Sequence, residues 1–217
     1  MIKLTKLLSI GVLALGLAAC GSSEESSGNT ESQVEKSDTS AKEESKSDSK
    51  ENYGIISNYG DVEVIKNFGD FTLEGNESVD YSLKDIKLVR LSNFTDDAEM
   101  GLMWALGVES VDEFPEEIYA VTGKELKKNK TEESIEFTGV HTLAAGTEQV
   151  DMIEGDIITD DNEGSTMMAG TEQANEFAVP VKSADLDNLS FVLSAAFDSE
   201  TMSNNFAEEQ TFDVNPK

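Results

Sequence analysis

Apolar and polar residues alternate in short runs along most of the chain beyond residue 53. The clearest runs are Phe177-x-Val179-x-Val181 and Phe191-x-Leu193-x-Ala195-x-Phe197. Shorter runs with the same period are Val62-x-Val64, Phe71-x-Leu73, 118–122, Ile135-x-Phe137, Val150-x-Met152 and Phe212-x-Val214. A period of two sends side chains alternately to the two faces of a strand. Turn-forming residues separate the runs at 160–164, 185–188 and 198–199. The pattern predicts a mainly β fold, an antiparallel sandwich or barrel.

Three places interrupt this alternation. The step from Leu83 to Ile86 is one residue too long for a regular strand, which predicts a β-bulge or bend there. Asn58-Tyr59-Gly60 is expected to separate an Ile55-Ile56 run from the run at 62–64. Phe68-Gly69-Asp70 is expected to precede a further strand at 71–73.

One segment, 95–107, has the pattern of a helix. Asp96 and Asp97 favour a helix N-terminus, and Glu99 stands three residues after Asp96, as in a capping box. Gly107 is a candidate stop. A second short turn is expected between Ser110 and Pro115, so we interpret 95–116 as a short helical insertion that crosses between strands.

The apolar side of this insertion has two interpretations. Met100, Met103, Trp104 and Gly107 share one helical face at three- and four-residue spacing. We expect this group, with Leu102 and Leu106, to plug one end of the sandwich core. The alternative is that Met100, Met103 and Trp104 form an exposed partner surface, because Met and Trp are common in interfaces.

The N-terminus has the pattern of an export signal. Lys3 and Lys6 precede an apolar stretch at 7–17 that is shorter than the roughly 20 residues needed to span a bilayer. Leu17-Ala18-Ala19-Cys20 resembles the bacterial lipobox. The resemblance implies that residues 1–19 are a lipoprotein signal peptide, removed after Cys20 receives diacylglycerol on its sulfur. The alternatives are an ordinary signal peptide with an incidental cysteine, or a core helix.

Residues 20–52 form the next unit, in which a low-complexity segment follows Cys20. Positions 21–52 contain ten Ser, nine acids and four Lys, a net charge of −5, and Val34 and Ala41 are their aliphatic residues. Such a composition buries too little apolar surface to offset its ordering entropy. We therefore expect a disordered linker that acts as a spacer, with a binding segment as the alternative, followed by one domain over 53–217.

Charge narrows the classes of partner. The chain has 44 acidic and 16 basic residues, a formal charge of −28. Residues 53–217 contain 35 of the acidic and 10 of the basic residues, a charge of −25. This excludes a general nucleic-acid binder, because phosphate recognition needs clustered Lys and Arg. It favours cationic peptides or proteins, which the field of the domain attracts.

The residues offer little catalytic or metal chemistry. Cys20 is the one cysteine and would be lipidated, and His141, the one histidine, is expected to be a half-buried packing residue. Asp160-Asp161-Asn162-Glu163 is dense in oxygen but departs from an EF-hand loop, so we expect a hydrated turn. Lys124, Lys127, Lys128 and Lys130 either receive an anionic partner or, as we expect, protect a strand edge. We predict no catalytic residues, no metal ligands and no cofactor.

A family resemblance adds to this pattern. Asn129-Lys130-Thr131, Ile135-Glu136-Phe137 and the stretch at 146–151 resemble the small Ig-like domains that recur in lipoproteins of Gram-positive bacteria and are classed as domains of unknown function. Phe177 to Val181 and Leu189 to Asp198 resemble their last strands. The resemblance covers about 117–200. It implies an Ig-like β-sandwich at the cell surface, and it brings no known ligand.

These observations predict a noncatalytic lipoprotein. It would be held by Cys20 on the extracellular face of a Gram-positive cell membrane, and its domain would bind an unidentified ligand, envelope protein or cationic partner. The alternatives are an accessory subunit of a transporter or other envelope complex, and a hydrolase that uses paired carboxylates. We expect the domain to contain no buried polar cluster around a cleft.

Overall fold

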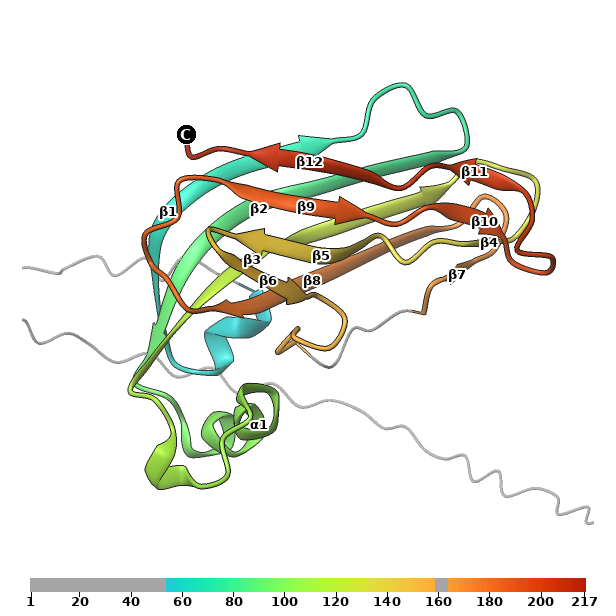
Figure 1. Cartoon of the computed structure of the whole chain (residues 1–217). Coiled ribbons are helices and arrows are strands. Elements are labelled where there is room, and N and C mark those ends of the chain that lie inside the picture. The colour runs from blue at the N-terminus through green and yellow to red at the C-terminus, as the bar shows by residue number, and fades with distance from the viewer. Residues whose placement is uncertain (1–53, 159–163) are drawn as a thin grey trace, which may run out of the picture. The chain divides into compact units, whose positions relative to one another are not determined.

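The computed structural model describes residues 54–158 and 164–217 (Figure 1). The largest sheet has the strand order β1-β2-β3-β8, and all its neighbours are antiparallel. Its strands are β1 (Asp61–Thr72), β2 (Val79–Ser92), β3 (Glu117–Asn129) and β8 (Glu172–Val181). Because β3 lies between β2 and β8, it is an interior strand. We call this sheet the long sheet.

A second layer faces the long sheet and consists of two shorter sheets, with orders β12-β9-β5-β6 and β11-β10-β4-β7 (Figure 1). The first contains β5 (Val140–Ala145), β6 (Glu148–Asp151), β9 (Leu189–Leu193) and β12 (Gln210–Val214). The second contains β4 (Ile135–Glu136), β7 (Thr166–Met167), β10 (Ala196–Asp198) and β11 (Asn205–Ala207). The expected antiparallel β-sandwich with a short helical insertion is therefore confirmed.

The main core fills the space between the two layers. Tyr81 and Leu88 of the long sheet and Leu143 and Phe191 of the facing sheet are buried in it. At one side, Phe71 of β1 stacks on Phe212 of β12 with ring centroids 3.5 Å apart, so aromatic packing joins the two layers at their edge. Burial of these alternating side chains is the main stabilising contribution to the sandwich.

A second core covers the opposite face of the long sheet. Leu88 of β2 belongs to the main core, and its neighbour Val89 belongs to this second one, because adjacent strand residues point to opposite faces. The cover is supplied by the 3-10 helix η1 (Gly54–Asn58), the helix α1 (Asp96–Leu106) and Ile157-Ile158. This part of the molecule consequently has three layers, and α1 and η1 lie below the sandwich in Figure 1.

The predicted bulge in β2 is confirmed. The pairing with β3 shifts between Lys84 and Lys87, and Asp85 has a φ of 55°. The expected break at 58–60 is confirmed: η1 ends at Asn58 and β1 begins at Asp61, and Ile55-Ile56 before the break is part of a helical turn that packs in the second core. The break expected at Phe68-Gly69-Asp70 is wrong, because these residues lie inside β1, which continues through them with register shifts at Gly69. A short apolar run does not distinguish a strand from a buried helical turn.

The helical insertion exists, but its start and its path differ from expectation. The N-cap is Thr95, whose hydroxyl accepts a hydrogen bond from the Ala98 amide, so the expected capping box on Asp96 is wrong. Gly107 ends the helix with a φ of 66°, as predicted. The short 3-10 helix η2 (Val111–Glu113) follows. Since β2 and β3 pair directly, with Ser92 opposite Glu117, the insertion is a long hairpin connection and does not cross between distant strands.

Candidate functional site

The inward face of β3 changes from apolar to polar along its length. Val121 lies in the main core, whereas Glu125, Lys127 and Asn129 follow on the same face and are 8 %, 3 % and 0 % exposed. A charged side chain in this position is costly unless it is paired and hydrogen-bonded. We call these three residues the inward polar row.

Two hydrogen bonds hold the Glu125 carboxylate. Its Oε1 accepts hydrogen bonds from the Tyr81 hydroxyl at 2.7 Å and from the Val140 amide at 2.9 Å. Burial and the nearby carboxylate raise the pKa of Tyr81 well above its ordinary value, so the phenol stays a donor. Gly139 makes room for this carboxylate: its φ is 88°, and a Cβ there would lie 2.1 Å from Glu125 Oε1.

Lys127 and Asn129 complete the inward polar row. Lys127 Nζ lies 3.2 Å from the Thr138 carbonyl oxygen and 3.6 Å from Glu125 Oε2. Asn129 Nδ2 donates to the carbonyl oxygens of Glu133, Met167 and Met168, at 2.8, 3.2 and 3.2 Å. The row therefore holds together segments that are far apart in sequence, and the expectation of a domain with no buried polar cluster is wrong.

A cavity of about 290 Å³ lies beside this row. Its lining includes the apolar residues Leu83, Val140, Met152 and Phe177 and the polar residues Glu125, Asp156 and Asn175. These and the other lining residues come from β2, β3, β5, β8 and the segments before β5, after β6 and before β7, so elements distant in sequence build the cavity. The buried polar cluster thus adjoins a hollow that could accept a small molecule.

Asp156 joins the cavity wall to the free edge of β8. Its Oδ1 accepts the amides of Ile158 and Ala178, each at 2.9 Å, and the Ile157 amide donates to the Ala178 carbonyl at 2.9 Å. Burial raises the pKa of Asp156 from 3.8 to about 6; the two amides lower it, and the Glu125 charge raises it further. Glu125 and Asp156 are therefore two carboxylates at one cavity, one of them with a raised pKa.

The insertion does not place its side chains as expected. Ala98 and Leu102 are buried in the second core, whereas Met100 is 66 % and Trp104 84 % exposed, and Met103 is half-buried. The predicted plug formed by Met100, Met103 and Trp104 is wrong, because the buried face of α1 is the one that carries Ala98 and Leu102. The exposed residues Met100, Trp104 and Val111 form what we call the insertion surface.

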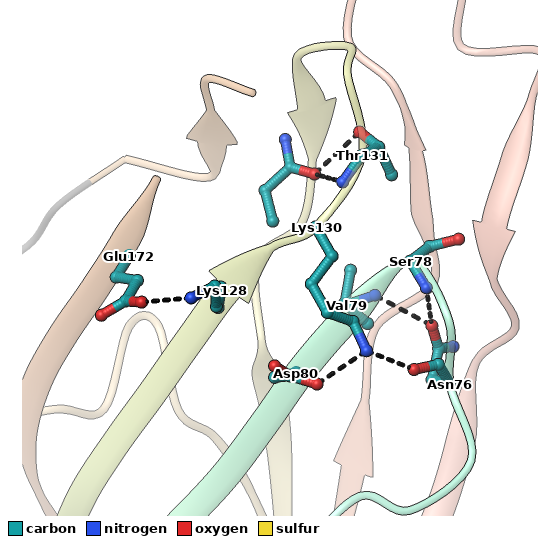
Figure 2. Close-up of polar contacts among 9 residues, drawn as sticks. Asn76, Ser78, Val79, Asp80, Lys128, Lys130, Thr131 and Glu172 are labelled. Atoms are coloured by element: carbon teal, nitrogen blue, oxygen red, sulfur yellow. Dashed lines mark hydrogen bonds and ion pairs between the residues drawn. The ribbon is translucent and has the colours of Figure 1, made fainter. Parts of the chain in front are cut away.

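The expected basic cluster is dispersed (Figure 2). Lys124 and Lys128 point outward and pair with Glu176 and Glu172 of β8, at 2.7 and 2.5 Å, whereas Lys127 points inward. Lys130 binds Asp80 at 2.7 Å and the Asn76 carbonyl oxygen at 2.6 Å. The proposed protection of an edge is wrong, because β3 is an interior strand, and each of these four lysines pairs with a carboxylate of the chain.

The remaining candidates show no clustering. His141, on β5, is half-buried; its Nδ1 lies 2.9 Å from Thr142 Oγ1, and its Nε2 lies 3.7 Å from Glu209 Oε2. Within residues 54–158 and 164–217, no group of three or more His, Cys, Asp or Glu side chains could hold a metal ion. Cys20, the lipobox Leu17-Ala18-Ala19, the linker and the acidic residues 160–163 lie outside the described residues.

Comparisons with known proteins identify no family and no function. None of the protein-family models matches the chain, and neither does any curated protein. A crystal structure of a functionally unknown protein from Listeria monocytogenes EGD-e is similar over 73 % of this chain and 88 % of that chain, with 15 % identity and a TM-score of 0.48. The strand arrangement itself defines the class: a β-sandwich with a helical hairpin insertion.

In the described part, no helix has the length and apolar character that crossing a membrane requires.

Sequence reasoning missed the inward polar row and the cavity. Leu126, the one aliphatic residue of 124–129, is 40 % exposed, whereas its charged neighbour Lys127 is 3 % exposed, so hydrophobicity does not mark the buried face of this stretch. The one available signal was Gly139, a small residue between two apolar runs.

Asp156→Asn is expected to remove a pH-dependent loss of stability. The raised pKa means that the folded state holds the proton more tightly than the unfolded chain, so the contribution of Asp156 to stability falls as pH rises from about 4 to above 6. The difference amounts to about 3 kcal/mol at pH 7. Urea unfolding of both proteins at pH 4 and 7 measures it. Parallel pH curves for the two proteins would contradict the assignment.

Lys127→Met is expected to destabilise the domain by about 3 kcal/mol, because it leaves the buried Glu125 without its cation. The double variant Glu125→Gln/Lys127→Met should lose clearly less than the sum of the two single changes, measured by urea unfolding. Lys128→Met is the matched control: it lies on the same strand, faces outward, and should cost less than about 1 kcal/mol. Equal losses for Lys127 and Lys128 would refute the buried pairing.

Proposed function

We propose that the chain is a noncatalytic lipoprotein whose Ig-like domain binds a cationic, partly apolar protein or peptide outside the cell. In this proposal Cys20 anchors the chain to the extracellular face of a Gram-positive membrane, and residues 21–52 act as the spacer. The supporting sequence features are the lipobox Leu17-Ala18-Ala19-Cys20 and the low-complexity stretch that follows it.

One observation carries the binding role: α1 presents its largest side chain to solvent. Trp104 is 84 % exposed and follows Met100 by one helical turn, while the opposite side of α1 packs in the second core. A rigid helix that displays Trp and Met is typical of a contact surface. Val111, 52 % exposed on η2, adds to it.

Charge sets the chemistry of the partner. Residues 95–116 contain seven acids and no Lys or Arg. Asp97 precedes Met100 by three residues on α1 and is exposed, and so are Glu109 and Asp112 beyond the helix. Exposed apolar side chains with an acidic surround complement a segment that carries Lys or Arg beside apolar residues.

A carboxylate-dependent hydrolase is the second candidate, because Glu125 and Asp156 line one cavity. Each of these carboxylates already binds backbone amides, Val140 for Glu125, and Ile158 and Ala178 for Asp156. A group that holds the fold through such bonds is poorly suited to exchange protons with a substrate. The accessory-subunit alternative would use the same insertion surface as the binding module.

Trp104, the one tryptophan of the chain, reports directly on the proposed surface. Titration of the full chain in detergent with a synthetic helical Lys/Leu peptide should shift its fluorescence to shorter wavelength, because binding removes the indole from water. Affinity should fall at least tenfold between about 50 and 500 mM salt, since screening weakens the charge attraction. A Lys/Gly peptide of equal charge should give no such shift.

Met100→Ser should weaken that binding about fivefold, whereas Met168→Ser, which alters an exposed Met beyond β7, should leave it unchanged. An unchanged fluorescence spectrum, a response independent of salt, or equal effects of the two variants would refute the proposed surface.

The anchor is tested separately. Mass spectrometry of the chain isolated from membranes of a Gram-positive host should find an N-terminal Cys20 with a diacylglycerol mass, and Cys20→Ser should release the protein into the medium. A mature N-terminus without lipid would refute the anchor and leave the binding test unaffected.

A further inference from the structure

The inward face of β8 carries two amide side chains whose oxygens have no partner. Gln173 lies opposite Lys127 and Asn175 opposite Glu125 in the β3–β8 register. Gln173 Oε1 and Asn175 Oδ1 are both buried and accept no hydrogen bond in the described part of the chain. Leaving a buried acceptor unpaired costs about 1–3 kcal/mol, so each such oxygen calls for a physical explanation.

Asn175 lies in the wall of the cavity, beside Glu125 and Asp156. Three of the polar groups in this wall, two carboxylates and one amide oxygen, are therefore acceptors. Among the described residues that line it, none is Lys, Arg or His. The carboxylate of Glu176 is directed elsewhere, to Lys124 and the Ile55 amide.

Lys127, the nearest buried cation, does not offset all of these acceptors. Lys127 Nζ is already engaged by the Thr138 carbonyl oxygen and Glu125 Oε2. It offsets the charge of Glu125. Asp156 has two amides on Oδ1 but no cation among the described lining residues, and the Asn175 oxygen has no partner in the described part of the chain, so both can be satisfied by a group that enters the cavity. Such a group must bring hydrogen-bond donors and positive charge.

The apolar lining residues and the cavity volume indicate the size and the apolar part of the bound molecule. Leu83, Met152 and Phe177 add apolar contacts to the lining. A volume of about 290 Å³ lies at the lower end of the range for small-molecule sites, which fits a molecule of few heavy atoms. A molecule that combines charged donors with a short apolar chain matches this mixed lining.

We propose that this cavity binds a small primary ammonium ion with a short apolar chain, whose N–H groups reach Asn175 Oδ1 and the Asp156 carboxylate. The site is distinct from the insertion surface on α1 and does not depend on the function proposed for that surface.

Three compounds of matched shape test the proposal on the full chain in detergent at pH 7.5: n-butylamine, n-butanol and butyrate. The readout is calorimetry together with NMR shifts of the Val140, Ile158 and Ala178 amides, which bond to the two cavity carboxylates. n-Butylamine should give saturable shifts at these amides, and butyrate should give none. Equal shifts with n-butanol, or no shifts with the amine, would overturn the proposal.

Variants at Asn175 separate binding from folding. Asn175→Leu removes the orphan oxygen, so it should keep or raise stability and weaken n-butylamine binding at least tenfold. Asn175→Asp keeps the shape, adds negative charge and should strengthen binding. Glu172→Gln, which alters an outward carboxylate of the same strand, is the control and should change nothing. Unchanged amine affinity in both Asn175 variants would also overturn the assignment.

Discussion

Burial of both faces of the long sheet is the constraint on which the rest of the structure depends. Leu88 and Val89 are adjacent in β2 and both have no exposed surface, so apolar cover is needed above and below the sheet. The facing sheets provide it on one side. On the other side, the cover comes from segments outside the sandwich, η1, α1 and Ile157-Ile158. Without this third layer, Val89, Leu91 and Ala120 would lie in water at a cost of about 25 cal/mol for each Å² exposed.

This constraint explains the orientation of α1. Ala98 and Leu102 turn toward the long sheet because that sheet has apolar surface to cover. A helix of eleven residues cannot bury both of its sides against one sheet, so Met100 and Trp104 are left on the outer side. The proposed contact surface is thus a consequence of how the second core is closed.

The other end of the long sheet is held by polar contacts in place of apolar packing. The inward face of β3 becomes polar at Glu125. From there on hydrogen bonds replace apolar packing, and each side chain is fixed by backbone groups outside β3: Val140 for Glu125, Thr138 for Lys127, and Met167 and Met168 for Asn129. Such a network specifies geometry more than it adds stability, since two buried charges pay for desolvation. The cavity lined by Glu125, Asp156 and Phe177 adjoins this network.

The sequence by itself determined the local elements: the period-two strands, the bulge between Leu83 and Ile86, and a helix ended by Gly107. These depend on neighbouring residues and on backbone conformations that a few residue types favour. The export signal and the lipobox were predicted in the same way and stay predictions. Only the tertiary structure decided which side of each element is covered. Leu126 faces water, and Lys127 faces the core. Strand alternation places neighbouring side chains on opposite faces, but it does not determine which face meets a second layer. The same holds for Asp156 and Asn175, since a cavity arises from segments far apart in the chain, whose contacts no local pattern records.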